Sequence, residues 1–307
     1  LVVTDLKKNK GILKDKSSIE WTRKTGTSVE FVIDGRIQIN GEGGVLSYLR
    51  GSALLNPHMT LHYEIADQKL VTIKRVVQES PMVPPSTQPH PHTMKLGEFI
   101  SYARFFGRKR VKDWLLTEFS KISEKLLNSI VKASSLKKTD MNKTLSSFTA
   151  DNFKQLYSAL QESELPDPST KSVMSIGEKS LSLSILRLGE IDYFSVVTRK
   201  AVICDYKPVQ VEIALARLKS KRSESDAPVQ VLRFANRVPL QFDKSSCAIV
   251  KAITSVNWKS YGLKQSKSSL PSGPYIFAVS VVSPFIKFKN ASKETIDASE
   301  DLVMELR

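Results

Sequence analysis

The sequence predicts an α+β protein in which strand-rich regions lie at both ends of the chain and a helical region lies between them. Apolar and polar residues alternate in short runs before residue 80 and after residue 189, as they do in half-buried strands. Between residues 96 and 188, apolar residues recur at helical spacing instead. Five prolines in residues 79–95 separate the first strand-rich region from the helical one. With 307 residues, the chain is long enough for two or three domains, each with its own core.

Composition and charge limit the classes of function that the chain can have. An apolar content of 41% and a charged content of 25% are typical of a globular protein, and no apolar run is long enough to span a membrane. Two cysteines, Cys204 and Cys247, are too few for a disulfide framework or a zinc site. The net charge of +15 favours a polyanionic partner, and we expect nucleic acid before a membrane. Because the residues after Leu1 are typical of the middle of a domain, we expect a fragment of a longer protein.

Residues 1–80 carry strand signals and one helix. Alternation after a glycine predicts a strand at residues 26–33, and two further strands are predicted at residues 59–65 and 70–77, joined by a turn at residues 67–68. A helix ending near Asn56 is predicted by apolar residues at helical spacing, namely Val45, Tyr48, Leu49 and Ala53. The glycines before this helix, in residues 41–44, could hold a phosphate at its N-terminus. No P-loop lysine follows them, which favours a flexible connection instead.

The proline-rich residues 79–95 predict an extended, stiff linker, and residues 96–188 are predicted to be helical. Helical spacing begins at Leu96, continues from Trp114 to Ile130, recurs around Phe153 and opens a last helix near Ile176. His90 and His92 in the linker offer two metal ligands. The interspersed prolines and the lack of an acidic or cysteine partner argue against a metal site there.

A basic segment at residues 104–112 stands out within the helical region. Residues 95–150 hold 12 Lys and Arg against 5 Asp and Glu, an excess of 7 positive charges. Five of these cations lie in the basic segment: Arg104, Arg108, Lys109, Arg110 and Lys112. Such a run is often only a solvated face. Together with the charge of the whole chain, however, it makes these five residues our candidates for contact with the DNA backbone.

Residues 189–307 return to strand patterns. One face of a predicted strand carries Val209, Val211, Ile213 and Leu215, opposite Gln210, Glu212, Ala214 and Ala216, which predicts a sheet with one better-buried face. A polar hairpin tip is expected at residues 217–226, followed by a strand at residues 229–234 and a helix capped by Ser245 or Ser246. Residues 274–282 are apolar on both faces and predict a central strand.

Two stretches of this region resemble the transducer domain of the DNA topoisomerase VI B subunit family. They are residues 235–240 (Ala-Asn-Arg-Val-Pro-Leu) and residues 258–263 (Trp-Lys-Ser-Tyr-Gly-Leu), with the predicted helix between them. In that family the lysine of the second stretch reaches the ATP site of the neighbouring domain and touches the terminal phosphate. The resemblance therefore implies that Lys259 senses the γ-phosphate, if ATP is used, and that Asn236 and Arg237 support its loop.

The remainder of the chain resembles the same family. Residues 26–31 and 47–64 are similar to the last strands and helix of its GHKL-type ATPase domain, and residues 89–92 (Pro-His-Pro-His) to its hinge. Residues 174–178 resemble the turn in its helix-two-turns-helix domain, with Ser175 in place of the family's proline, and Thr93 replaces a glycine. We therefore expect four parts. They are the end of an ATPase α/β sandwich (1–80), a linker (81–95), a small helical helix-two-turns-helix-like domain (96–188) and a ribosomal protein S5-like transducer domain (189–307).

The resemblance implies a subunit that couples its own state to DNA cleavage. The family's magnesium-binding asparagine, Asp-x-Gly-x-Gly segment and glycine-rich lid are not found in this sequence, so ATP and magnesium are expected in the full-length protein and not in this chain alone. The departures from the family pattern favour a divergent, meiotic B-like subunit in the nucleus, partner of an A-type subunit that cuts both DNA strands through a tyrosine. In that case catalytic activity is uncertain.

The alternative is an ATP-driven topoisomerase subunit in the archaeal cytoplasm. Either interpretation implies contact with DNA and self-association of the B subunit within a heterotetramer, and neither involves a membrane. A stand-alone nucleic-acid-binding protein would explain the charge but not the transducer-like residues.

The end of the chain is predicted to be a helix over residues 292–307. Its apolar residues Ile296, Val303 and Leu306 would lie on one side, and the sequence offers no C-cap at residue 307, so we expect the native helix to continue. In the resembling family this helix docks on the A-type subunit. Ile296, Val303 and Leu306 are therefore the predicted partner-binding residues, with packing on the chain's own sheet as the competing interpretation.

Overall fold

The computed structural model describes residues 2–5, 10–13, 17–65, 69–219 and 227–307, and it divides into two units, residues 1–37 and 38–307. In the first unit, β1 (Val2–Asp5) and β2 (Lys10–Leu13) form an antiparallel hairpin. The strand predicted at residues 26–33 is wrong: these residues have no regular structure, and Phe31 and Val32 are 71% and 98% exposed. Alternation alone does not make a strand, because its backbone groups need a neighbouring strand, and none of the described strands pairs with it.

The second unit begins with a helix and a short hairpin. The predicted helix is confirmed as α1 (Val45–Leu55), and it ends at Asn56, whose side-chain amide donates to the Ser52 carbonyl at 2.8 Å. The two strands predicted after it are present but shorter, as the antiparallel β3 (Leu61–Tyr63) and β4 (Val71–Ile73). The turn predicted at residues 67–68 lies outside the described residues.

A helical cluster follows the extended linker, which ends in a 3-10 turn at Pro91–Thr93. Its helices are α2 (Leu96–Phe105), α3 (Val111–Glu118), α4 (Glu124–Ala133) and α5 (Ala150–Glu162). The helix predicted to run from Trp114 to Ile130 is therefore two helices. The break contains Lys121, whose φ is +66°, and Ser123, whose hydroxyl accepts from the Leu126 amide and begins α4. The cluster closes around an aromatic core that includes Phe99, Trp114 and Phe119.

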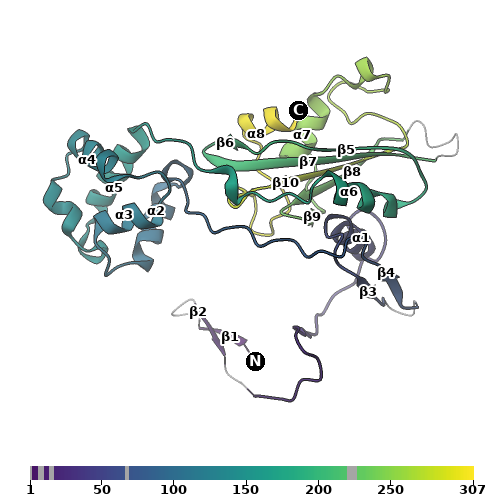
Figure 1. Cartoon of the computed structure of the whole chain (residues 1–307), viewed down its shortest axis with the longest axis horizontal. Helices are drawn as coiled ribbons and strands as arrows, with labels where there is room; N and C mark the ends of the chain where they lie inside the picture. Colours follow the sequence, from purple (N-terminus) through teal and green to yellow (C-terminus); the bar gives the residue numbers. More distant parts are fainter. Residues whose placement is uncertain (1, 6–9, 14–16, 66–68, 220–226) are drawn as a thin grey trace. The chain divides into compact units, whose positions relative to one another are not determined.

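The rest of the chain builds one mixed sheet. Its strands are β5 (Ile191–Thr198), β6 (Val202–Cys204), β7 (Lys207–Leu218), β8 (Gln230–Ala235), β9 (Val238–Leu240) and β10 (Tyr275–Val282). Their order is β5-β7-β10-β8-β9, and β6 also pairs with β7. The strand β10 runs antiparallel to β7 and parallel to β8 (Figure 1), which confirms the central strand predicted at residues 274–282. The predicted hairpin tip falls largely on residues 220–226, outside the described residues.

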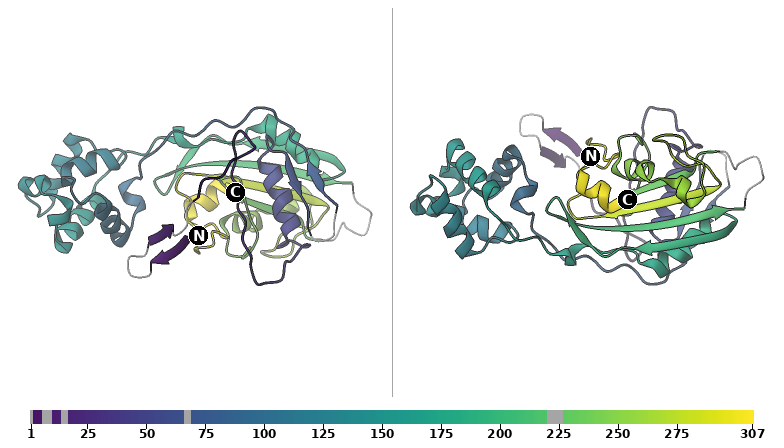
Figure 2. Two further views of the ribbon diagram at one scale, coloured as in Figure 1. Left: turned by 90° about the horizontal axis from the view of Figure 1, so that it is seen from below. Right: turned by 90° about the horizontal axis from the view of Figure 1, so that it is seen from above.

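Helices cover both faces of this sheet. The helices α7 (Ala248–Ser255) and α8 (Glu300–Leu306) lie on one face, with α1 and α6 (Glu178–Ile185) on the other (Figures 1 and 2). The prediction of one better-buried face is therefore wrong, because Val211 on one side and Ala214 and Ala216 on the other are all fully buried. The helix α6 packs with the sheet residues, whereas the expected domain boundary at residue 188 assigned it to the helical region.

Candidate functional sites

Lys259 lies on a short turn that is shaped by its neighbours in the sequence. The helix α7 ends at Ser255, and residues Trp258–Tyr261 form a single 3-10 turn. Gly262 closes this turn with φ of +80°, a left-handed conformation that glycine adopts without steric cost. Its amide donates to the Lys259 carbonyl at 3.1 Å. The Lys259 backbone is therefore held in one tight turn at the end of a sheet-packed helix.

Trp258 anchors the turn from beneath. Its indole Nε1 donates to the Ile253 carbonyl at 2.7 Å, and its ring centroid lies 5.0 Å from that of Phe277 in β10. Gln265 completes the anchor, because its Oε1 accepts from the Trp258 amide at 3.0 Å and its Nε2 donates to the Ser269 carbonyl at 2.9 Å. Sequence reasoning singled out Lys259 but missed Gln265, which follows the motif with no distinctive spacing.

The Lys259 ammonium is available to bind an anion. Its side chain is exposed, and within the part of the chain that the structure describes it makes no ion pair or side-chain hydrogen bond. It lines an open hollow of about 560 Å³ together with Lys264, Gln265, Ser266 and Ser272. The Lys259 ammonium beside the hydroxyls of Ser266 and Ser272 favours an anionic ligand, and a phosphate would form a charge-assisted hydrogen bond with that ammonium.

Asn236 and Arg237 do not support the Lys259 turn, contrary to the prediction. They form the tight turn between β8 and β9, with φ of +49° and +69°. The Asn236 amide group bonds the Ser283 backbone twice, accepting from its N–H at 2.9 Å and donating to its carbonyl at 2.8 Å. This pins the C-terminal end of β10, whereas Trp258 packs on Phe277 near the N-terminal end of the same strand. The two motifs therefore fix opposite ends of the central strand.

A buried carboxylate on β7 is a second feature that sequence reasoning missed. Glu212 is 0% exposed and accepts from the amides of Ile176 and Gly177, at 3.0 and 2.8 Å, and from the Thr198 hydroxyl at 3.2 Å. Its negative charge also opposes the fall that burial causes in the pKa of Arg237. In the sequence, Glu212 could have been recognised as the one acidic residue among the apolar residues of a predicted strand. Glu212 ties the segment before α6 to the middle of the sheet.

The basic segment divides into free and paired cations. Among the described residues, Lys109 pairs with Glu118 at 2.5 Å and Lys112 with Glu124 at 2.9 Å, and the Lys109 hydrogen bond lowers the pKa of the Glu118 carboxyl. The side chains of the remaining three predicted DNA-binding residues are exposed and form no ion pair within the described chain: Arg104, Arg108 and Arg110. Tertiary pairing therefore reduces five candidate cations to three that are available for phosphates.

The backbone of the basic segment is fixed by a second segment. The amides of Leu145 and Ser146 donate to the carbonyls of Lys109 and Gly107 at 3.0 and 2.9 Å, and the Val111 amide donates to the Lys143 carbonyl at 3.0 Å. These bonds hold the turn between α2 and α3 in place without using the arginine side chains.

Comparison with known proteins places the sheet region in a family. Residues 168–307 match the family model described as topoisomerase VI B subunit, transducer. The chain is 29% identical over 301 residues to the B subunit of type 2 DNA topoisomerase 6 from Archaeoglobus fulgidus, covering 98% of this chain and 49% of that protein. It is 30% identical over 278 residues to the protein of the same name from Methanococcoides burtonii, covering 91% and 44%. The chain belongs to the topoisomerase VI B subunit family.

The match spans only part of such a subunit, because the chain covers about half the length of these relatives. The matched transducer region contains β5 to β10, α6, α7 and α8, and the α+β class predicted from the sequence is confirmed. Among solved structures, the B subunit of DNA gyrase from Myxococcus xanthus aligns over 42% of this chain and 40% of that one, at 17% identity and a TM-score of 0.30, too low to support any inference. Within the described residues, no helix has both the length and the apolar character that crossing a bilayer requires.

Two of the residues predicted to bind a partner are buried in the transducer region. The helix predicted over residues 292–307 is wrong, because α8 begins only at Glu300, capped by Ser299. Before it, the chain is extended: the Lys289 amide donates to the Thr295 carbonyl at 2.9 Å, and Ile296 pairs with Phe288 in an isolated bridge. Ile296 is therefore not on the helix at all.

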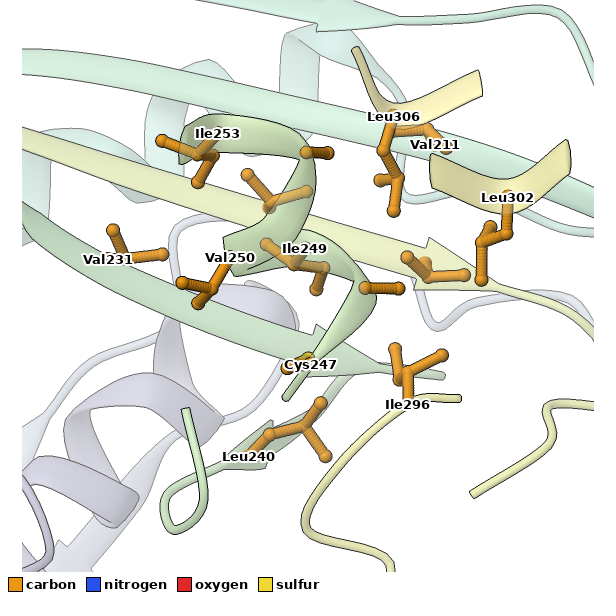
Figure 3. Close-up of a cluster of buried hydrophobic side chains, with 14 of the residues drawn as sticks. Val211, Val231, Leu240, Cys247, Ile249, Val250, Ile253, Ile296, Leu302 and Leu306 are labelled. Carbon is orange, nitrogen blue, oxygen red and sulfur yellow. The ribbon is translucent and has the colours of Figure 1, made fainter. Parts of the chain in front are cut away.

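Ile296 and Leu306 belong to the core between the sheet and α7, together with Leu302 (Figure 3). Val303 is only partly buried, and Met304 is 74% exposed. The helix α8 thus packs on its own domain, because Leu302 and Leu306 lie in one core with α7. Of its apolar side chains, Met304 offers the most surface to another molecule.

His90 and His92 at the hinge make structural contacts with the residues around them. The backbone amide of His92 donates to His90 Nδ1 at 3.3 Å, and His92 Nε2 lies 2.8 Å from the Leu160 carbonyl. Tyr206 stacks on the His90 ring with centroids 4.9 Å apart. Burial, and then the neighbouring His92, lower the pKa of His90 to about 4. Among the described residues, no group of three or more metal-ligating side chains exists here or elsewhere.

Proposed function

We propose that this chain is the part of a topoisomerase VI-type B subunit that passes the state of a nucleotide site to an A-type subunit, which cuts both DNA strands. One observation carries the proposal. Lys259 is exposed and unpaired among the described residues, yet its backbone is held in an anchored turn within a transducer-type sheet. A cation that has no partner and is carried by a fixed backbone is suited to bind a negative charge that arrives from elsewhere.

Binding of a negative charge at Lys259 can shift the elements that pack against its turn. A phosphate near Lys259 would form a charge-assisted hydrogen bond with its ammonium and pull on the Trp258–Tyr261 turn. Because Trp258 donates to Ile253, the pull acts directly on α7. The residues of α7 pack against Leu302 and Leu306 of α8 in one core, which transmits a shift of α7 to the end of the chain (Figure 3). ATP with magnesium would supply the phosphate, held by nucleotide motifs that this sequence does not contain.

The other parts of the proposal concern partners. Arg104, Arg108 and Arg110 would contact DNA phosphates without reading base sequence, and the B subunits would associate with each other and with the A-type subunits in a heterotetramer. The names of the archaeal relatives, which are type 2 DNA topoisomerase 6 B subunits, support the topoisomerase alternative. A role in meiotic double-strand break formation in the nucleus stays a prediction that these relatives do not support.

The test is Lys259→Ala in the full-length B subunit assembled with its A-type partner. We expect the variant to bind nucleotide and to associate with a second B subunit as the wild type does, and to lose at least tenfold in nucleotide-dependent DNA cleavage. Lys251→Ala is the matched control, because Lys251 is an exposed lysine on the adjacent helix α7, and its cleavage should match the wild type. Cleavage by Lys259→Ala at the wild-type rate would overturn the proposal.

A further inference from the structure

Phe105 is an apolar side chain in an unusual position. Its ring is 84% exposed, and it is the single large hydrophobic side chain that is exposed in the helical cluster, residues 96–165, all of which are described. The next residue, Phe106, behaves ordinarily: its ring centroid lies 5.3 Å from that of Tyr102, and the Lys109 ammonium lies 5.3 Å from its centroid. Leaving a phenylalanine in water forgoes roughly 1.5–3 kcal/mol of burial free energy, so the exposure of Phe105 calls for an explanation.

The ring is presented from a rigid base. Phe105 is the last residue of α2, and the turn that follows is held by the backbone bonds from residues 143–146 described above. On the same helix, Ala103 is fully buried in the aromatic core of the cluster. The ring therefore projects from a fixed point of the surface and not from a loose loop.

The charged residues next to Phe105 in the sequence are all cations. Residues 99–112 contain no Asp or Glu, and the three arginines that remain free are Arg104 immediately before Phe105, with Arg108 and Arg110 following it. An apolar ring among unpaired arginines does not suit an ordinary apolar protein surface, which would bury those charges without partners. It suits a ligand whose outside is a row of phosphates and whose inside is a stack of apolar rings.

We propose that Phe105 is a wedge that enters the minor groove of duplex DNA and inserts between two base pairs, while Arg104, Arg108 and Arg110 hold the phosphates beside it. This inference rests on the proposed contact between the basic segment and DNA. Minor-groove wedges of this kind partly unstack one base step and kink the duplex, at a cost that the added contacts repay. A track for single-stranded DNA would need several exposed aromatic platforms, and the cluster presents one.

The experiment compares binding to two short duplexes of equal length and charge, one fully matched and one with a single central mismatch. A mismatched step is already partly unstacked, so a wedge enters it at lower cost. We expect the intact chain to bind the mismatched duplex about fivefold more tightly than the matched one. Phe105→Ala should remove this preference, and Phe105→Trp should keep it. Met82→Ala is the control, because Met82 in the linker is 75% exposed, and this variant should keep the preference in full.

A second measurement separates the wedge from the phosphate contacts. Replacing Arg104, Arg108 and Arg110 with alanine should weaken binding to both duplexes equally and lower the salt dependence by nearly three units of slope, leaving the mismatch preference intact. Phe105→Ala should leave that slope unchanged, since it removes no charge.

The outcomes distinguish the two ideas. If the arginine variant has the wild-type slope, both the DNA contact and the wedge are wrong. If its slope falls but Phe105→Ala keeps the mismatch preference, the phosphate contact stands and the wedge is overturned. The wedge is also overturned if Phe105→Ala weakens binding to a single strand more than binding to the duplexes, because the ring would then stack on unpaired bases.

Discussion

The transducer sheet and the helical cluster use polar residues in opposite ways. In the sheet region, polar side chains hold backbone segments together: the buried Glu212 binds the segment before α6, the exposed Asn236 pins the end of β10, and the half-buried Gln265 holds the Lys259 turn. In the helical cluster the core is built from apolar and aromatic residues, and the charged residues of the basic segment stay on the surface. A binding group in the sheet region therefore depends on polar side-chain contacts to the backbone, whereas one in the cluster depends on the packed backbone that carries it.

This contrast predicts its largest effect at Glu212. Glu212→Ala would leave the half-buried amides of Ile176 and Gly177 without their acceptor and remove the charge that acts on Arg237. We expect the free energy of unfolding of the sheet region to fall by about 3–5 kcal/mol. Chemical denaturation would measure this loss. The control is Gln210→Ala, whose side chain on the same strand makes an exposed bond to the Arg199 carbonyl. A loss at Glu212 no larger than that of the control would refute the role of buried polar ties.

His90 at the hinge should make stability depend on pH. Its pKa is 6.5 in the unfolded chain and about 4 in the folded one, because burial disfavours the charged ring. His92 and Lys121 also lower this pKa, whereas the Pro166 backbone and Asp167 raise it. The unfolded chain therefore binds a proton first as the pH falls, and this group's contribution to stability is present above pH 6.5 and lost towards pH 4.

The expected loss from His90 between pH 7 and pH 4 is about 3 kcal/mol of unfolding free energy. Denaturation curves of the wild type and of His90→Gln across this range would isolate it, since the variant lacks the titrating ring. Parallel curves for the two proteins would show that His90 titrates normally in the folded state.

Substitution of Trp258, which anchors the Lys259 turn, should have an effect on stability of intermediate size. Trp258→Phe keeps a ring against Phe277 but removes the hydrogen bond to the Ile253 carbonyl. We expect a loss of about 1–2 kcal/mol in stability, together with weaker nucleotide coupling in the full-length complex. Lys259→Ala should reduce coupling without reducing stability. Equal stability of Trp258→Phe and the wild type would mean that the turn does not depend on its anchor.

The smallest effect on stability is expected in the basic segment. Replacing Arg108 with alanine should change the free energy of unfolding by less than about 0.5 kcal/mol, because the side chain is exposed and the backbone bonds of its turn remain. Lys109→Ala is the matched comparison for Arg108→Ala, because it removes a cation that is already paired with Glu118. It should leave the salt dependence of DNA binding unchanged, whereas Arg108→Ala should lower its slope by nearly one unit.

Local patterns in the sequence determined the elements that depend on local geometry. The helical spacing around Leu49 and Phe99, and the apolar run that ends at Val282, were sufficient to predict α1, α2 and β10, because burial of one helix face or of both strand faces leaves a regular imprint on the chain. The uncommon residues from Trp258 to Leu263 were likewise enough to indicate the family that the comparisons confirm, and they made Lys259 a candidate.

Tertiary structure alone decided which of these residues are available. Whether Lys109 and Lys112 are free depends on Glu118 and Glu124, and a charge count does not reveal how a turn brings such residues together. Ile296 follows a local pattern that also fits a helix, yet its strand-like bridge with Phe288 places it in the core. Periodicity records the backbone conformation that a segment prefers. Pairing and burial depend on residues distant in the chain, and these fixed the free arginines, the buried Glu212 and the exposed ring of Phe105.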